Sequence, residues 1–229
     1  MKTLKSTTYF ISIILIGFVL YVFIIKRFFI VYRVDQHSME NTLIDGDKVL
    51  VKLTDNISKN DIVIFQYNNT AFIKRLIGNP GDSLYIKNNI VYVNNQNIVS
   101  LYNLKNGASN SDKDIMILNS FGKRWTLSNW GPVVIPKKGV SIKLTSDNYS
   151  IYQRIIEEEQ RKNINFQQLK DVSYKYTFKH NYIFVLGDNR LHSDDSRLFG
   201  FIPTANIIGK TNLVLFSMSD ISRIFKTIK

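Results

Sequence analysis

An uncharged apolar run near the amino terminus is the strongest constraint on how this chain folds. From Tyr9 to Ile25 the sequence has no charged residue, close to the roughly 20 residues that cross the ~30 Å hydrocarbon core of a bilayer. A cleaved signal peptide is the alternative, but its apolar segment is usually about 7–15 residues and precedes a small-x-small site. Here Lys26 and Arg27 follow the run instead. We therefore predict a retained transmembrane helix over residues 9–30, after a tail of residues 1–8.

The charge and the absence of cysteine exclude several classes of chemistry. Lys and Arg total 30 against 18 Asp and Glu, and the net charge of +12 favours nucleic acid or anionic lipid as a partner. Basic residues lie on both sides of the apolar run, so charge does not give its orientation. Without cysteine there is no disulfide, thiolate metal site or cysteine nucleophile. A total of three histidines argues against a histidine metal site or a Ser-His-Asp triad.

Short alternating or β-branched runs dominate the sequence after Arg33. Pairs of asparagines that favour tight hairpin turns separate several of them, at positions 68–69, 88–89 and 94–95. The predicted strands are 48–53, 61–67, 71–77, 83–86, 90–93, 182–186 and 211–216. This spacing is typical of a meander or a partly closed, barrel-like arrangement of antiparallel sheets, so we predict a mostly β fold.

A polar stretch over residues 100–179 interrupts the strand pattern. Within it, Tyr152, Ile155 and Ile156 recur at helical intervals, which predicts one amphipathic helix over residues 148–163. The predicted organisation after the transmembrane helix is a β-rich core over 31–99 and 180–218, an inserted subdomain over 100–179 containing that helix, and a basic tail over 219–229.

Three segments with reactive residue types lie where predicted strands turn, at residues 36–43, 72–76 and 187–197. Taken singly, they read as a linker, a charged strand edge and a turn held by Asx hydrogen bonds. Taken in this order and spacing, they resemble the bacterial type I signal peptidases, or leader peptidases. The last segment fits G-D-N-R-x-x-S-x-D-S-R at every fixed position, and the resemblance covers most of the chain outside the insertion.

The resemblance implies a Ser-Lys serine endopeptidase that removes signal peptides from exported preproteins after a small-x-small motif. Ser38 would attack the scissile carbonyl, Lys74 would be the general base, and Ser193 would hydrogen-bond the Lys74 amine. No metal or organic cofactor is implied. The enzyme would be a single-pass protein of the bacterial cell (inner) membrane with its catalytic domain on the extracytoplasmic side. Preprotein signal peptides and membrane lipids would be its partners, without nucleic acid.

The same resemblance gives supporting roles to other positions. A buried ionic network would support the site through Arg75, Asp188, Asp195 and Arg197. Met39 and Ile73 would wall a shallow pocket for small substrate side chains.

Two positions depart from the family pattern. Asn41 stands where proline is common after the nucleophile, so we expect a less rigid turn. The backbone N–H of Ser38 would be one oxyanion donor. Gln36 stands where some members have a serine that supplies a second donor, so either its amide or another backbone N–H would replace that serine.

The residue types also fit this chemistry without the resemblance. A serine nucleophile needs a base, and lysine serves only when neutral, which requires desolvation because its ordinary pKa is about 10.4. In a strand, Lys74 shares a face with Phe72 and Leu76, whereas Arg75 points to the other side. Lys74 can then lie in apolar surroundings while Arg75 meets a carboxylate.

Three other functions compete with this interpretation. His37 and His192 each adjoin a serine, as in a Ser-His-Asp hydrolase, but neighbouring residues of an extended chain point apart. A self-cleaving repressor would use a related Ser-Lys pair, but the apolar run and the absence of a helix-turn-helix pattern argue against it. A non-catalytic membrane-tethered β-domain that binds a partner or anionic lipid leaves residues 187–197 unexplained. In each case the basic tail over residues 223–229 would contact lipid headgroups.

Overall fold

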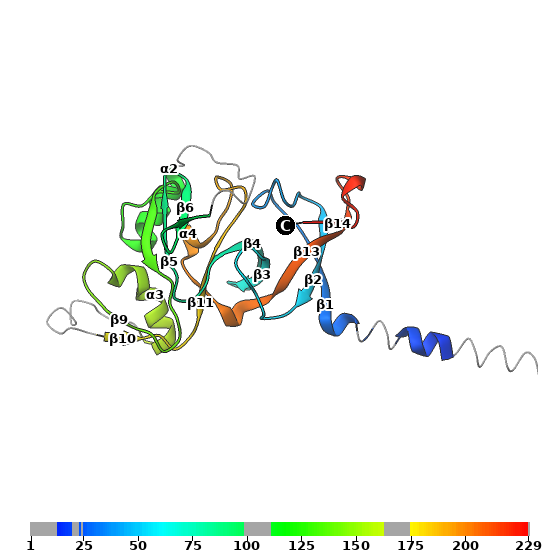
Figure 1. Cartoon of the computed structure of the whole chain (residues 1–229), viewed down its shortest axis with the longest axis horizontal. Helices are drawn as coiled ribbons and strands as arrows, with labels where there is room; N and C mark the ends of the chain where they lie inside the picture. The colour runs from blue at the N-terminus through cyan, green and yellow to red at the C-terminus, as the bar shows by residue number, and fades with distance from the viewer. Residues whose placement is uncertain (1–12, 20–22, 24, 99–110, 163–174, 229) are drawn as a thin grey trace, which may run out of the picture.

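The computed structural model describes residues 13–19, 23, 25–98, 111–162 and 175–228. Residues 13–19 and 25–28 are helical and extend away from the β-rich body (Figure 1). Among the described residues, no helix combines the length and apolar character needed to cross a membrane. The helix predicted over residues 9–30 lies partly outside the described residues, and its last two residues belong to a strand instead. The apolar pattern continues into that strand, which is why the predicted boundary was too late.

The main sheet is antiparallel and open. Its strands are β1 (Phe29–Arg33), β2 (Asp47–Leu53), β3 (Ile62–Tyr67), β4 (Thr70–Gly78), β11 (Tyr182–Leu186), β12 (Ile202–Pro203), β13 (Ile207–Ser217) and β14 (Lys226–Thr227). They follow the order β1-β2-β13-β3-β4-β11-β12, and β14 pairs with β13. The prediction of a mostly β, antiparallel fold is confirmed, but the sheets do not close into a barrel.

A second layer of structure lies on the other side of β11 (Figure 1). It contains β5 (Ser83–Lys87), β6 (Ile90–Val93), β7 (Gln96–Asn97), α2 (Ser111–Phe121), β8 (Trp130–Val134), β9 (Ser141–Lys143), α3 (Tyr149–Gln160) and β10 (Lys175–Thr177). One sheet has the order β7-β6-β5-β8, and β9 pairs with β10. Residues from the predicted insertion and from the predicted core therefore share a sheet.

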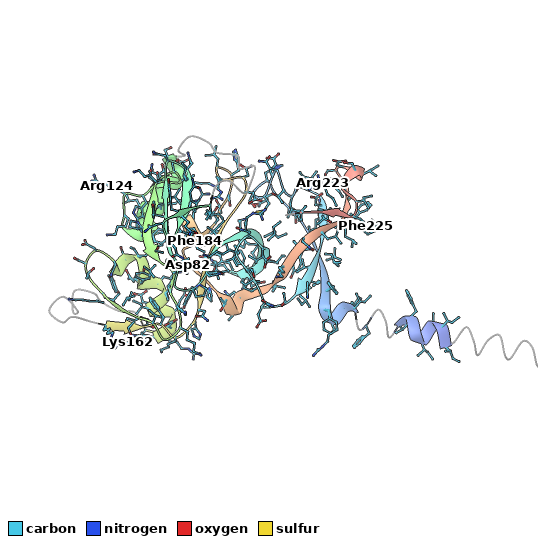
Figure 2. The ribbon with its side chains drawn as sticks, in the orientation of Figure 1. Asp82, Arg124, Lys162, Phe184, Arg223 and Phe225 are labelled. Atoms are coloured by element: carbon cyan, nitrogen blue, oxygen red, sulfur yellow. The ribbon has the colours of Figure 1, made fainter. Side chains whose placement is uncertain are left out.

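Phe184 of β11 lies between the two layers (Figure 2). Its side chain is fully buried, and its ring centre is 4.9 Å from that of Trp130 in β8. Leu84 and Tyr152 belong to the same buried cluster, so the insertion packs against the core through one continuous apolar contact.

Paired asparagines form the two-residue loops of three hairpins. Both members of each pair have positive φ, at 46° and 61° for residues 68–69, 50° and 66° for 88–89, and 51° and 64° for 94–95. Asparagine tolerates this left-handed region, and the resulting turn matches the twist of the flanking strands. The turns predicted at these pairs are thus present, and they fix the register of β3–β4, β5–β6 and β6–β7.

Of the helices α2 and α3, both within the described residues 111–162, one was predicted and the other was not. Helix α3 buries Tyr152, Ile155 and Ile156, as its periodicity indicated. Helix α2 buries Ile117 and Phe121 but leaves the neighbouring apolar side chains Ile115, Met116 and Leu118 exposed. This mixed pattern removes the amphipathic signal by which a helix is recognised in a sequence.

Candidate active site

The serine and lysine of the first two segments meet in space. Ser38 lies in the loop between β1 and β2, and Lys74 lies in the middle of β4. Ser38 Oγ and Lys74 Nζ are 2.7 Å apart, within hydrogen-bond distance. The Ser38 side chain is half-buried and Lys74 is only 3% exposed, so a substrate can reach the hydroxyl while the amine stays away from water.

Burial lowers the pKa of Lys74 from 10.5 to about 8. The negative charges of Asp195 and Asp194 oppose this shift, whereas the positive charge of Lys113 adds to it. The ring of Phe72 lies 5.5 Å from Nζ and forms part of the apolar surroundings. At a pKa of 8 about one-tenth of the amines are neutral at pH 7, against a fraction of about 1 in 3,000 for a lysine at its ordinary pKa of 10.5. Lys74 can therefore accept a proton near neutral pH.

The segment 187–197 reaches this pair because β11 runs beside β4, with Leu186 opposite Arg75. Asn189 then holds the main chain around the nucleophile: its N–H donates to Ser38 O (3.1 Å), and its side-chain Nδ2 donates to His37 O (3.0 Å). The sequence interpretation missed this role, although Asn189 is a fixed position of the G-D-N-R pattern and could have been found there.

Ser193 is fully buried in the same segment. Its Oγ has no hydrogen-bond partner among the residues that the structure describes, so the implied bond to the Lys74 amine is not present in this arrangement.

Two buried Arg–Asp pairs lie beside the site. Arg75 donates to both oxygens of Asp188, from Nε at 2.8 Å and Nη2 at 2.6 Å. Arg197 donates to both oxygens of Asp195 at 2.9 Å, and this charge lowers the pKa of Asp195 although burial opposes the shift. The Gly187 N–H also donates to Asp195 (3.1 Å). These bidentate contacts hold both ends of the segment 187–197 in place.

A third buried pair joins the carboxyl-terminal segment to the loop that follows Ser38. Arg223 precedes Phe225 in the turn beside β13 and β14 (Figure 2). It donates to Asp47 Oδ2 at 2.7 Å and to Thr42 O at 2.8 Å, and the Thr42 hydroxyl donates to Asp188 (2.6 Å). Arg223 is 7% exposed and Asp47 is fully buried, so this member of the predicted headgroup-contacting tail binds within the protein.

The two positions that depart from the family pattern have unusual backbone conformations. Asn41 has a φ of 93°, which proline cannot adopt because its ring holds φ near −65°. Asparagine therefore suits the turn that this chain makes after Ser38. Gln36 has a φ of 80°, its side chain is exposed, and its N–H donates to Asp45 (3.0 Å).

A cleft of about 310 Å³ opens beside the Ser38–Lys74 pair. Its lining includes Met39 and Ile73, the predicted pocket walls, and Gln36, a predicted contact to the substrate's oxyanion. The loop after β1 forms one wall and the first half of β4 forms the other.

The family model described as "Signal peptidase, peptidase S26" matches residues 7–216. The chain belongs to this family. It is 30% identical to signal peptidase IB of Staphylococcus aureus (strain N315) over 93% of this chain and 91% of that protein. It is also 30% identical to signal peptidase I of Buchnera aphidicola subsp. Baizongia pistaciae over 91% of this chain and 75% of that protein. A crystal structure of a signal peptidase I from Enterococcus faecalis V583 aligns with 68% of this chain and 96% of its own, at 22% identity and a TM-score of 0.33.

Membership of the signal peptidase family confirms the predicted activity, the removal of signal peptides by a serine peptidase. Within this peptidase, His37 and His192 are both exposed, whereas the basic group in contact with Ser38 is Lys74. The geometry therefore does not favour a Ser-His-Asp arrangement.

Gly187 gives a first test of how closely the peptidase packs around its site. A Cβ at this position would overlap the Ser193 side chain and would lie 2.5 Å from Ser38 O. We expect Gly187→Ala to push these two segments apart, reducing kcat about 10²-fold and stability by about 1–3 kcal/mol. Cleavage kinetics and denaturant unfolding would measure both effects. Gly139→Ala is the control for adding a methyl, since nothing lies within 4 Å there, although it adopts positive φ. A fully active Gly187→Ala enzyme would contradict the argument.

Proposed function

We propose that Ser38 is the nucleophile and Lys74 the general base of this signal peptidase. The single observation that carries the proposal is the 2.7 Å contact between Ser38 Oγ and a lysine amine buried enough to have a pKa of about 8. The neutral amine takes the Ser38 proton as Oγ attacks the scissile carbonyl, and it returns that proton to the leaving amine. It then removes a proton from the water that hydrolyses the acyl-enzyme.

The negative oxygen that forms during attack needs donors in fixed positions. The backbone N–H of Ser38 serves as one of them. The side-chain amide of Gln36, a residue that lines the same cleft, serves as the second. Ser193 directs the Lys74 amine in the reacting complex, in which catalytic hydrogen bonds are shorter than in the free enzyme.

The cleft supports cleavage after a small-x-small motif. Met39 is 1% exposed and Ile73 is half-buried, so both present apolar side chains that are held by the surrounding core. Both side chains line the cleft, and in this proposal the part that they wall accepts small substrate side chains.

We also propose a single-pass anchor and a catalytic domain on the extracytoplasmic side of the bacterial cell membrane. The uncharged run Tyr9–Ile25 supports the anchor. Its described large apolar side chains between residues 13 and 19 are at least 57% exposed, as expected of a helix that lipid surrounds. The net charge of +12 favours contact with anionic lipid.

The dependence of cleavage on pH tests the proposed base. Lys74 is active only when neutral, so kcat/KM should rise about tenfold per pH unit below pH 8 and level off above about pH 9. The measurement is cleavage of a purified preprotein in detergent, with the amino terminus of the product sequenced to locate the cut. A profile that is flat between pH 6 and 9 would contradict the assignment of Lys74. A folded enzyme that fails to cut any preprotein would favour the membrane-tethered binding domain.

A further inference from the structure

One lysine of helix α2, in the insertion, hydrogen-bonds to the segment 187–197. Lys113 lies in the first turn of α2, and its Nζ donates to Ser193 O at 3.2 Å and to Asp194 Oδ1 at 2.8 Å. The Lys113 side chain is 18% exposed, so most of it is packed between the helix and the segment. Helix α2 also contacts α4 (Ser196–Phe199), which begins just after Asp195.

We propose that Lys113 is a positioning residue of the active site, which fixes Ser193 and Asp194 relative to Lys74 through these two hydrogen bonds. This inference rests on the proposed Ser38–Lys74 dyad. It gives the insertion a role in the reaction, because the charged amine of a residue in α2 donates to Ser193 O and Asp194.

Lys113 can fix the direction of the Ser193 side chain by holding the Ser193 main chain. The Ser193 Oγ makes no hydrogen bond of good geometry among the described residues, although it lies near the Asp195 carboxylate and contributes to the lowered pKa of that group, so side-chain hydrogen bonds hold its direction only loosely. The carbonyl group does have a charged donor in Lys113, and charge-assisted hydrogen bonds are the stronger kind. Anchoring this carbonyl limits rotation of the Ser193 main chain and so fixes where Oγ points.

Lys113 and Asp194 also act on Lys74 with opposite signs. Among the charged groups that surround Lys74, Asp195, Asp194 and Asp188 raise its pKa, whereas Lys113 lowers it. The ion pair therefore places two opposing charges near the base, and removing either charge should move the pKa of Lys74 in a known direction.

Stability should respond little to the same changes. Asp194 is 59% exposed, and ion pairs with such an exposed partner contribute about 0–1 kcal/mol. A purely structural role for Lys113 would therefore show as a small change in unfolding and no change in the pH profile.

The experiment measures the pH profile of preprotein cleavage for the full chain and for Lys113→Met, Asp194→Asn and the double variant. We expect Lys113→Met to move the rising limb to higher pH and Asp194→Asn to move it to lower pH, each by about 0.3–0.5 pH unit. In the double variant the limb should return close to its wild-type position. The plateau kcat should fall about three- to tenfold in both variants that lack Lys113, because the Ser193 carbonyl loses its donor.

Two further variants serve as controls. Lys113→Arg keeps a charged donor and should recover most of kcat, whereas Lys87→Met removes an exposed lysine of β5 and should leave the profile unchanged. The inference would be overturned if the rising limb of the pH profile does not move, or if it moves in the same direction in both single variants. If Ser38→Ala still cleaves, the dyad itself is wrong. If Ser38→Ala is inert and the Lys113 variants behave as the wild type, this inference alone fails.

Discussion

Ser38→Ala and Lys74→Met are each expected to reduce cleavage by about 10⁴-fold or more, with the cut site of any residual product changed or lost. Each variant removes half of a unit that works only as a pair, so the double variant should be no slower than either single one. Single-turnover cleavage of a purified preprotein at pH 9, where Lys74 is mostly neutral in the wild type, gives the sharpest comparison.

Exposed residues of the same types give matched controls. Ser58→Ala and Lys87→Met change exposed side chains that do not line the cleft, and should keep wild-type rates. Cleavage at the same bond by Ser38→Ala would show that another group is the nucleophile.

Lys74→Met should also be more stable than the wild type, although this variant is inactive. The pKa of Lys74 is about 8 in the folded chain against 10.5 as its ordinary value, so at pH 7 folding buries a charged amine. This difference destabilises the folded state by up to about 3 kcal/mol at pH 7, and the penalty disappears as the pH rises from 8 to 10.5. Denaturant unfolding at pH 7 and at pH 10 would test the sign, since the gain from methionine should be larger at pH 7.

Arg223→Gln is expected to lower the free energy of unfolding by about 3–5 kcal/mol, the usual result of leaving a buried charge without its partner. Asp47 is fully buried, and Arg223 lowers its pKa although burial opposes the shift. The contribution of the pair is therefore present above the ordinary carboxyl pKa of 3.8 and is lost as the pH falls through the lower folded value. Denaturant unfolding at pH 7 measures the loss.

Two variants separate the buried pair from a general effect of charge. Lys226→Gln removes an exposed positive charge from the same tail and should change stability by less than about 0.5 kcal/mol. Adding Asp47→Asn to Arg223→Gln removes the unpaired carboxylate and should restore part of the loss. A loss below about 1 kcal/mol in Arg223→Gln would mean that the pair does not hold the loop.

Local patterns were enough to predict most of the strands. Strands β2 to β6, β11 and β13 follow alternating or β-branched runs, and the asparagine pairs mark three of their turns because only a few residue types accept positive φ. Lys74 and Arg75 point to different surroundings, an apolar cleft and Asp188, which follows from the two faces of a strand.

Contacts between distant residues could not be predicted in the same way. Arg223 and Asp47 are 176 positions apart, and in the sequence Arg223 is one of three basic residues in a short tail. Lys113 lies in a helix whose exposed apolar residues hide its periodicity, so neither the helix nor its contact with Ser193 had a local signal. Arg75 was assigned to a network, but which carboxylate it binds depends on β4 lying beside β11.

The contact between Arg223 and the loop after Ser38 also bears on the order of events during synthesis. Ser38 leaves the ribosome early, but Asp47 and the Thr42 carbonyl acquire their guanidinium partner only after residue 223 has been added. Until then the loop contains a carboxylate that resists burial, which favours an open, hydrated arrangement around the nucleophile. A nascent or truncated chain that lacks Arg223 should therefore remain without proteolytic activity, and the membrane would be exposed to an active hydrolase only after residue 223 has been added.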